Sequence, residues 1–219
     1  MQETEAKFYV QDLNKVRMQL EHVSARLIQE RVLETNIRFD LPDTSLRAEG
    51  RVLRIRQDTD TRLTYKSASQ NEQGVLSREE IEFVVEDFEK AKRFLEALGY
   101  QKLVYYEKYR TTYDLQPSEG FVQEIEVKRG EPSEGFTHVM LDELPYGNFV
   151  EIEGETIESI RAAADQLNMN WEAAIGTSYH ALFERAREAL NLPFQDISFA
   201  NFEGIKINAT DLGVDAADA

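Results

Sequence analysis

The chain begins with a segment in which every second residue is charged. Glu3, Glu5 and Lys7 alternate with small or apolar residues in the segment ETEAKF. Successive side chains of a β-strand point to opposite faces, so these three would share one face at intervals of about 7 Å. That face is either solvated or lines an interior that needs charge.

Six further strand-like segments repeat this pattern. The charged residues that share a face within each segment are Arg54 with Arg56, Arg62 with Lys66, Glu80 with Glu82, Lys108 with Arg110, Glu124 with Glu126 and Lys128, and Glu151 with Glu153. One interpretation is an antiparallel sheet with one solvated face. Paired arginines and paired carboxylates also fit a second interpretation, a β-barrel whose charged faces line the lumen. Composition alone leaves both open.

A lumen of this kind would bind a compact polyanion. The guanidinium fork of arginine matches phosphate oxygens in bidentate fashion, and lysine adds a point charge. Carboxylates in the same space would repel such an anion unless a hard divalent cation bridged them. The mixed charge therefore indicates metal-bound polyphosphate, with Mg²⁺ or Mn²⁺ as the expected cofactor.

Strand patterns alternate with helix patterns along the chain. Strands are predicted over 2–10, 32–40, 51–58, 61–69, 78–85, 102–115, 121–130, 136–144 and 148–155, and helices over 12–28, 87–99, 156–168 and 178–191. Asp87 and Thr156 are candidate helix N-caps. This order predicts an α+β fold with a large antiparallel sheet. Without a linker-like change in composition, we expect a single domain over 1–200 and an acidic C-terminal tail over 201–219.

The composition narrows the class of partner. The formal net charge of −16 disfavours nucleic acid, because DNA and RNA binding requires clustered basic residues on the surface. The absence of cysteine excludes disulfides, thiolate nucleophiles and cysteine-ligated zinc. The sequence shows neither an apolar signal region nor an apolar run of about 20 residues, so we expect a cytoplasmic protein without membrane partners.

These motifs together resemble the CYTH superfamily, the triphosphate tunnel metalloenzymes, which include class IV adenylyl cyclases, thiamine triphosphatases and inorganic tripolyphosphatases. The resemblance rests on the Glu-x-Glu-x-Lys strand at 3–7, on LRIR at 53–56, LTYKSA at 63–68 and KYR at 108–110, and on MLDELPYGNFVEIE at 140–153. It implies an eight-stranded antiparallel β-barrel with flanking helices that forms a tunnel for triphosphate. It also permits a homodimer.

The resemblance also implies roles for individual residues. The triphosphate would be bound by Lys7, Arg54, Arg56, Lys66, Lys108 and Arg110, and the metals by Glu3, Glu5, Glu151 and Glu153, with Asp142 as a further ligand. Lys7, Glu80 and Glu82 would act in catalysis, the two glutamates as further ligands or by positioning water.

Two features depart from the family's pattern. Arg38 stands where relatives often carry a tyrosine, and it would add a phosphate contact or alter how the attacking water is handled. The segment 117–136 is longer than the usual connection. Glu124 and Glu126 lie in it, and we expect them in a solvated hairpin without a metal role.

Three functions remain open on this basis. The first is metal-dependent hydrolysis of a triphosphate, with inorganic tripolyphosphate as the expected substrate. The second is class IV adenylyl cyclase activity, which needs an adenine pocket; Tyr105, Tyr106 and Trp171 are candidate stacking residues but suit a core equally well. The third is a non-catalytic module that binds polyphosphate or nucleotide. The three histidines, His22, His138 and His180, are expected to be structural.

Overall fold

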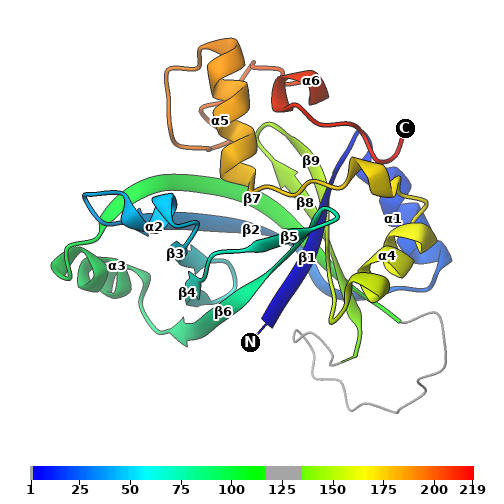
Figure 1. The fold of residues 1–219 in the computed structure, drawn as a ribbon, viewed down its shortest axis with the longest axis horizontal. Helices are drawn as coiled ribbons and strands as arrows, with labels where there is room; N and C mark the ends of the chain where they lie inside the picture. Colours follow the sequence, from blue (N-terminus) through cyan, green and yellow to red (C-terminus); the bar gives the residue numbers. More distant parts are fainter. Residues whose placement is uncertain (1, 117–134) are drawn as a thin grey trace.

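The computed structural model describes residues 2–116 and 135–219. Its nine strands form one antiparallel sheet in the order β1-β9-β8-β7-β2-β3-β4-β6-β5, and β6 also pairs with β1 (Figure 1). The strands are β1 (Gln2–Val10), β2 (Arg26–Asp40), β3 (Val52–Gln57), β4 (Thr61–Lys66), β5 (Gln70–Glu72), β6 (Val75–Val85), β7 (Gln101–Leu115), β8 (Thr137–Leu144) and β9 (Gly147–Glu153). Pairing of β6 with β1 closes eight strands into a barrel, with β5 as an addition to β6. The predicted fold class is confirmed.

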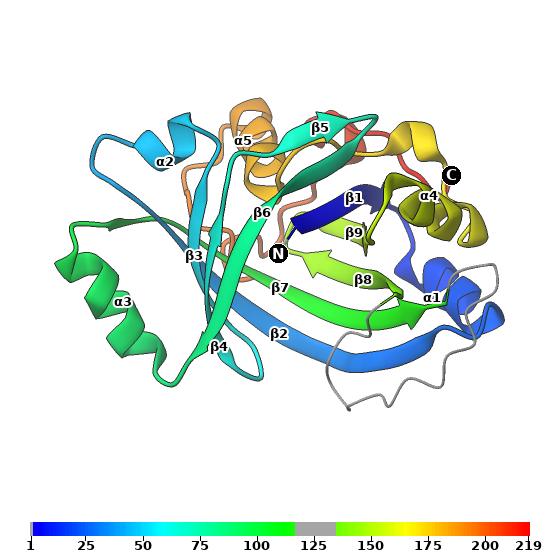
Figure 2. The same ribbon diagram turned by 60° about the horizontal axis from the view of Figure 1, so that its bottom comes forward.

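The longest strands, β2 and β7, hold the two sides of the barrel together. They pair along most of their length, and Figure 2 shows them sweeping across the molecule between β3, β4 and β6 on one side and β1, β8 and β9 on the other. Register shifts interrupt the pairing near Gln29 and between Arg38 and Phe39. Such irregularities increase local twist and help a sheet to curve into a barrel.

Helices cover the outer face of the barrel. They are α1 (Leu13–His22), α2 (Ser45–Ala48), α3 (Phe88–Ala97), α4 (Ile157–Gln166), the 3₁₀ helix η1 (Trp171–Ala173), α5 (Tyr179–Leu190) and α6 (Ala209–Leu212). The predicted N-caps are confirmed: the Asp87 side chain accepts a hydrogen bond from the Lys90 amide, and Thr156 accepts one from the Ser159 amide. Among the described residues, no helix is long and apolar enough to span a membrane.

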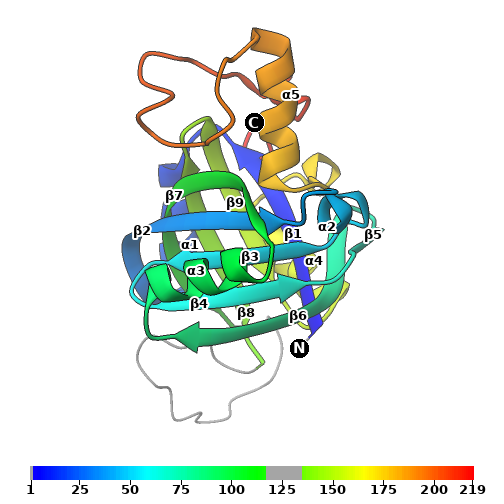
Figure 3. The ribbon, with the colours of Figure 1, turned by 90° about the vertical axis from the view of Figure 1, so that its left-hand side faces the viewer.

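The apolar core lies between the barrel and these helices. Outward residues of β1 and β9, such as Phe8 and Ile152, are buried beneath α1 and α4. The helix α3 lies across β3 and β4, where Leu95 packs against Ile55 (Figure 3). The apolar faces of these strands therefore point outward and their charged faces line the interior. At one end the interior is apolar instead, because Tyr9 and Phe149 pack there with residues of α5.

The first predicted helix and the strand after it differ most in extent, since the strand predicted over 32–40 begins at Arg26. The helix predicted over 12–28 ends at His22, because Ser24 adopts a left-handed conformation with φ of 57° and the chain enters β2 at Arg26. Leu27, which extended the helical spacing, pairs with Tyr113 of β7 and is 42% exposed. The strand predicted over 121–130, with Glu124 and Glu126, lies outside the described residues.

The C-terminal segment packs against the rest of the molecule. Leu212 is fully buried in the apolar cluster that includes α5. The Asp218 carboxylate accepts hydrogen bonds from the backbone amides of Gln11 and Asp12, at 2.7 and 2.9 Å. Residues 201–219 are therefore packed against the molecule, and Asp218 holds the junction between β1 and α1 in place.

Candidate active site inside the barrel

The charged face of strand β1 points into the barrel interior. Glu3, Glu5 and Lys7 are 6%, 5% and 3% exposed, which excludes the solvated-face interpretation for this strand. The Lys7 ammonium lies 3.5 Å from a Glu5 oxygen and 3.2 Å from a Glu151 oxygen on the adjacent strand β9. Two carboxylates and an ammonium therefore meet where β1 and β9 pair.

The carboxylates around the start of β1 are crowded. Burial raises the pKa of Glu153 to about 7, with further contributions from the negative charges of Glu3, Glu5 and Glu151. Burial also raises the pKa of Glu3, but its ion pairs with Lys66 and Arg78 outweigh burial and bring that pKa to about 2. This part of the interior holds more negative charge than its neighbouring cations neutralise.

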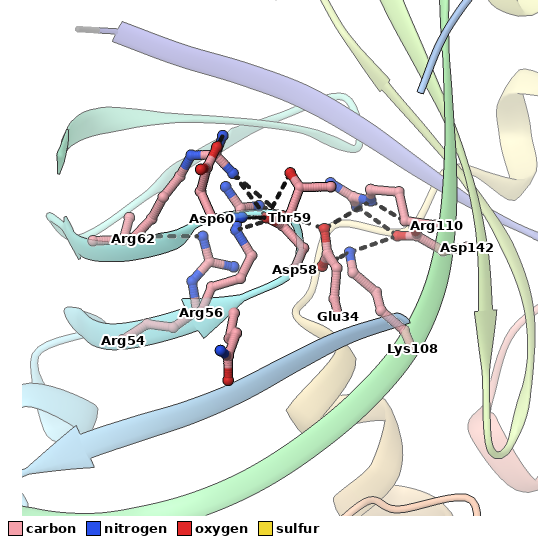
Figure 4. A network of polar contacts seen from close by, with 12 residues as sticks. Glu34, Arg54, Arg56, Asp58, Thr59, Asp60, Arg62, Lys108, Arg110 and Asp142 are labelled. Atoms are coloured by element: carbon pink, nitrogen blue, oxygen red, sulfur yellow. Dashed lines mark hydrogen bonds and ion pairs between the residues drawn. The ribbon is translucent and has the colours of Figure 1, made fainter. Parts of the chain in front are cut away.

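A second set of charges joins β2, β7 and β8 (Figure 4). The Lys108 ammonium lies 3.0 Å from Asp142 and 3.4 Å from Glu34, and Arg110 donates to both oxygens of Asp142 at 2.7 and 2.6 Å. Arg110 also donates to Glu151 at 2.9 Å, which links this set to β9. The predicted phosphate-binding residues of β7 therefore lie beside the predicted metal ligands.

A third set, on β3, β4 and β6, is rich in arginine (Figure 4). Arg56 donates to Glu82 at 3.1 Å, and the Arg54 guanidinium lies 3.6 Å from the same carboxylate. Arg62 pairs with Asp58 at 3.2 Å in the β3–β4 turn. Glu80 lies 3.2 Å from the Lys66 ammonium. The structure thus brings Glu80 and Glu82, the proposed water-positioning pair, next to separate cations.

Comparison with known proteins identifies the family. The CYTH domain model matches residues 1–174. This chain belongs to the CYTH family. A protein of Methanocaldococcus jannaschii named as a candidate adenylate cyclase is 32% identical over 127 residues, which cover 58% of this chain and 71% of that protein.

Solved structures share the CYTH fold. A candidate adenylate cyclase from Vibrio parahaemolyticus superposes with a TM-score of 0.64 at 19% identity, covering 83% of this chain and 97% of that one. A Pyrococcus horikoshii protein gives 0.61 at 21% identity, covering 81% and 96%. A Hippeastrum protein, described as a candidate adenylyl cyclase with a dominant triphosphatase activity, gives 0.55 at 16% identity, covering 83% and 95%. At these identities the likeness establishes the fold alone.

Three interior residues of this CYTH barrel were missed by the sequence analysis. Glu34 shares a strand face with Arg38, and Arg78 shares one with Glu80, so alternation could have found both. Tyr179 carried no such signal, because it begins α5 and reaches the interior through helix packing. Its hydroxyl donates to Asp142 at 2.8 Å, and the Lys7 ammonium lies 4.5 Å from its ring centroid.

The candidate adenine-stacking aromatics occupy different places. Trp171 packs against Phe8 on the outer face of the barrel, with a ring-centroid separation of 5.9 Å. Tyr105 also lies with the outer apolar residues and donates to Glu107 at 2.6 Å. Only Tyr106 of the three lies among the inward charges, where its hydroxyl accepts from Arg54 at 3.4 Å.

Two of the three histidines border the interior. His138 pairs in register with Glu153, and its Nδ1 lies 2.7 Å from an Asp114 oxygen. Burial lowers the pKa of His180 to about 4, with further contributions from the nearby charges of Arg38 and Arg47, so this ring is neutral near pH 7. His22 ends α1 on the outer side.

The donor chemistry fits a hard divalent cation. Carboxylate oxygens are the ligands that Mg²⁺ and Mn²⁺ prefer. Burial, together with the charges of Glu3, Glu5 and Glu151, raises the pKa of Glu153, and a bound cation would favour its ionised form. Within residues 2–116 and 135–219, no three acidic or histidine side chains are grouped closely enough to form a metal site as they stand. Ammonium and guanidinium groups lie between the carboxylates instead, as Lys7 does between Glu5 and Glu151.

Proposed function

We propose that this chain is a divalent-metal-dependent triphosphatase that hydrolyses inorganic tripolyphosphate or an organic triphosphate inside the barrel. The observation that carries the proposal is the buried interior in which basic and acidic side chains from separate strands converge. Within it, the Nε atoms of Arg54 and Arg56 are buried without a hydrogen-bond partner. Buried polar atoms are normally satisfied, so a phosphate chain would supply acceptors that the protein lacks.

Each interior group has a role in this proposal. The phosphates would be bound and neutralised by Lys7, Arg54, Arg56, Lys66, Lys108 and Arg110. The metal would be held by Glu3, Glu5, Glu151 and Glu153, with Asp142 as a further ligand. When bound, Mg²⁺ or Mn²⁺ would neutralise phosphate oxygens and lower the pKa of a coordinated water. Glu80 and Glu82 would orient the water for in-line attack on a terminal phosphoryl group.

Two observations support adenylyl cyclase activity as the second candidate. The M. jannaschii relative is named as a candidate adenylate cyclase, and Tyr106 places an aromatic ring inside the barrel beside Arg54. In that reaction the ribose 3′-hydroxyl of ATP attacks the α-phosphorus and pyrophosphate leaves. The same cations would bind the triphosphate, and Tyr106 would be available to the base.

The assay that separates these functions measures phosphate release from tripolyphosphate, ATP and thiamine triphosphate, each with Mg²⁺ and with Mn²⁺. Cyclic AMP is measured in the same ATP samples. We expect fastest release from tripolyphosphate without cyclic AMP. Cyclic AMP above the level of a Lys7→Ala control would favour the cyclase. Tight tripolyphosphate binding without turnover would indicate a non-catalytic binding module.

The variant Glu5→Gln tests the metal assignment. Glutamine keeps the shape of the side chain but removes the negative charge, so we expect metal-dependent turnover to fall by about 100-fold. Glu143→Gln is the matched control, because Glu143 pairs with Arg31 outside the barrel. Full metal-dependent activity in Glu5→Gln would show that the metal assignment is wrong.

A further inference from the structure

Arg38 differs from the other inward-facing basic residues of the barrel. The structure gives an acidic ion-pair partner to Lys7, Arg54, Arg56, Arg62, Lys66, Arg78, Lys108 and Arg110. Arg38 has none among the described residues, and its Nε is buried without a hydrogen-bond partner. A partly buried charge without a counter-charge is unfavourable, so the arrangement suits an external anion.

Two neighbours of Arg38 are also incompletely satisfied. Asn36, two residues earlier on the same face of β2, is 0% exposed, and neither its amide nitrogen nor its amide oxygen has a partner. Arg54 pairs in register with Arg38 across β2 and β3, and its Nε is likewise unpartnered. A buried amide and two guanidinium groups on adjacent strands thus offer unused donors to one region of the interior.

The electrostatics at this point favour an anion. Like charges directly opposite each other on paired strands are destabilising, as Arg38 and Arg54 are here. Burial lowers the pKa of Arg38. Tyr106 opposes this shift, while the charges of Arg54, Arg78 and Arg47 add to it. His180, which lies nearby, is neutral near pH 7 and adds no further positive charge. An oxyanion between the two arginines would turn this repulsion into attraction.

We propose that Arg38, Arg54 and Asn36 form a subsite for one oxyanion beyond a bound triphosphate, so that the preferred ligand carries four or more consecutive phosphates. This inference rests on the proposed function, because it extends the same phosphate site along β2. Arg38 would bind the added group through its guanidinium fork, and the Asn36 amide would donate to a further oxygen. Arg54 would bridge the added group and the triphosphate.

The test compares the dissociation constants of linear tripolyphosphate and linear tetrapolyphosphate by titration calorimetry. The full chain is used in EDTA, where metal-dependent turnover stops, and again with Mg²⁺. We expect wild type to bind tetrapolyphosphate at least about tenfold more tightly than tripolyphosphate. A hydrogen bond between the added phosphate and a charged group lowers the dissociation constant by about that factor or more. ATP and adenosine 5′-tetraphosphate form a second pair, which shows whether the added group is recognised on an organic triphosphate as well.

The variant Arg38→Gln should bring the ratio of the two dissociation constants to within about twofold, because it removes the contact that the added phosphate makes. Arg93→Gln makes the same change in charge on the exposed side of α3 and should keep the wild-type ratio. Because Arg38 has no acid partner, Arg38→Gln should melt no lower than wild type in anion-free buffer. That melting curve establishes that the variant is folded.

The remaining outcomes contradict the inference in distinguishable ways. If wild type binds both ligands equally, or Arg38→Gln keeps the preference, the subsite is refuted while tripolyphosphate binding still supports the proposed function. If neither ligand binds in either condition, both the subsite and the proposed function are refuted.

Discussion

Glu34 supplies negative charge at the centre of the barrel interior. It is 1% exposed, and its carboxylate lies near the cations of Lys108, Arg110 and Arg56. Burial raises the pKa of Glu34, but these cations outweigh burial and bring it to about 2. The ionised carboxylate on β2 therefore holds basic groups from β3 and β7 together before any ligand binds.

Replacing Glu34 with glutamine should destabilise the folded chain by about 3 kcal/mol in anion-free buffer, because buried cations lose their counter-charge. Since the folded-state pKa is depressed, this stabilisation is present above pH 4.5 and is lost as the pH falls toward 2. Urea unfolding at pH 7 and pH 3 measures both effects. Tripolyphosphate should restore much of the lost stability at pH 7.

The matched control is Glu143→Gln, whose pair with Arg31 is largely solvated; we expect a change within about 1 kcal/mol. If Glu34→Gln were as stable as wild type in the absence of anion, Glu34 would not be the counter-charge inferred here.

Most of these side chains could be predicted from alternation alone. Glu3, Lys7 and Arg54 lie inside because their strand neighbours are apolar and pack beneath helices. Glu34 obeys the same rule and went unnoticed because it stands alone rather than in a charged pair. The ion pairs themselves could not be predicted, because they depend on strand register, such as Lys108 opposite Glu34.

Among the elements, helix α5 contributes to the site through its first residue. The Tyr179 hydroxyl donates to Asp142, and its ring lies against the Lys7 ammonium. Tyr146 and Phe149 pack around it, with Phe149 in edge contact at 5.1 Å between ring centroids. The contact of Tyr179 with Asp142 could not be predicted, because it depends on where α5 packs after the long connection from β9.

The variant Tyr179→Phe should lower stability by about 1–3 kcal/mol, because a buried hydrogen bond to a charged group is lost. Tyr100→Phe removes a hydroxyl beside α3 and serves as the control, with an expected change below about 0.5 kcal/mol. Thermal unfolding of the three proteins in the same buffer compares them. Equal melting of Tyr179→Phe and wild type would show that α5 does not depend on this contact.

Considered as a whole, the molecule is strongly negative, although one part of its interior is rich in arginine. The net charge is −16, whereas the third set of interior charges is rich in arginine. The closed barrel explains how both occur together, because the apolar faces turn outward under helices and shelter the cations. The resemblance to the CYTH superfamily predicted this closure, which alternation alone left open. Segment 117–134 lies outside the described residues.

The net charge should slow the approach of a polyanionic substrate. The range of electrostatic repulsion shortens from about 30 Å at 0.01 M salt to about 10 Å at 0.1 M salt. Raising NaCl from about 10 to about 100 mM should therefore increase kcat/KM for tripolyphosphate about two- to fivefold at constant Mg²⁺. A Glu89→Lys, Glu96→Lys double variant on α3 should reduce this salt effect. A fall in kcat/KM with salt for wild type would show that attraction by the interior cations dominates instead.

The most direct test is a crystal structure of the wild-type protein soaked with tripolyphosphate and Mn²⁺, with anomalous data to locate the metal. We predict phosphate density beside Arg54 and Lys108 inside the barrel, and anomalous peaks beside Glu5 and Glu151. Phosphates and manganese bound only on the outer surface, with the interior ion pairs unchanged, would contradict the assignment of this barrel as a triphosphate site.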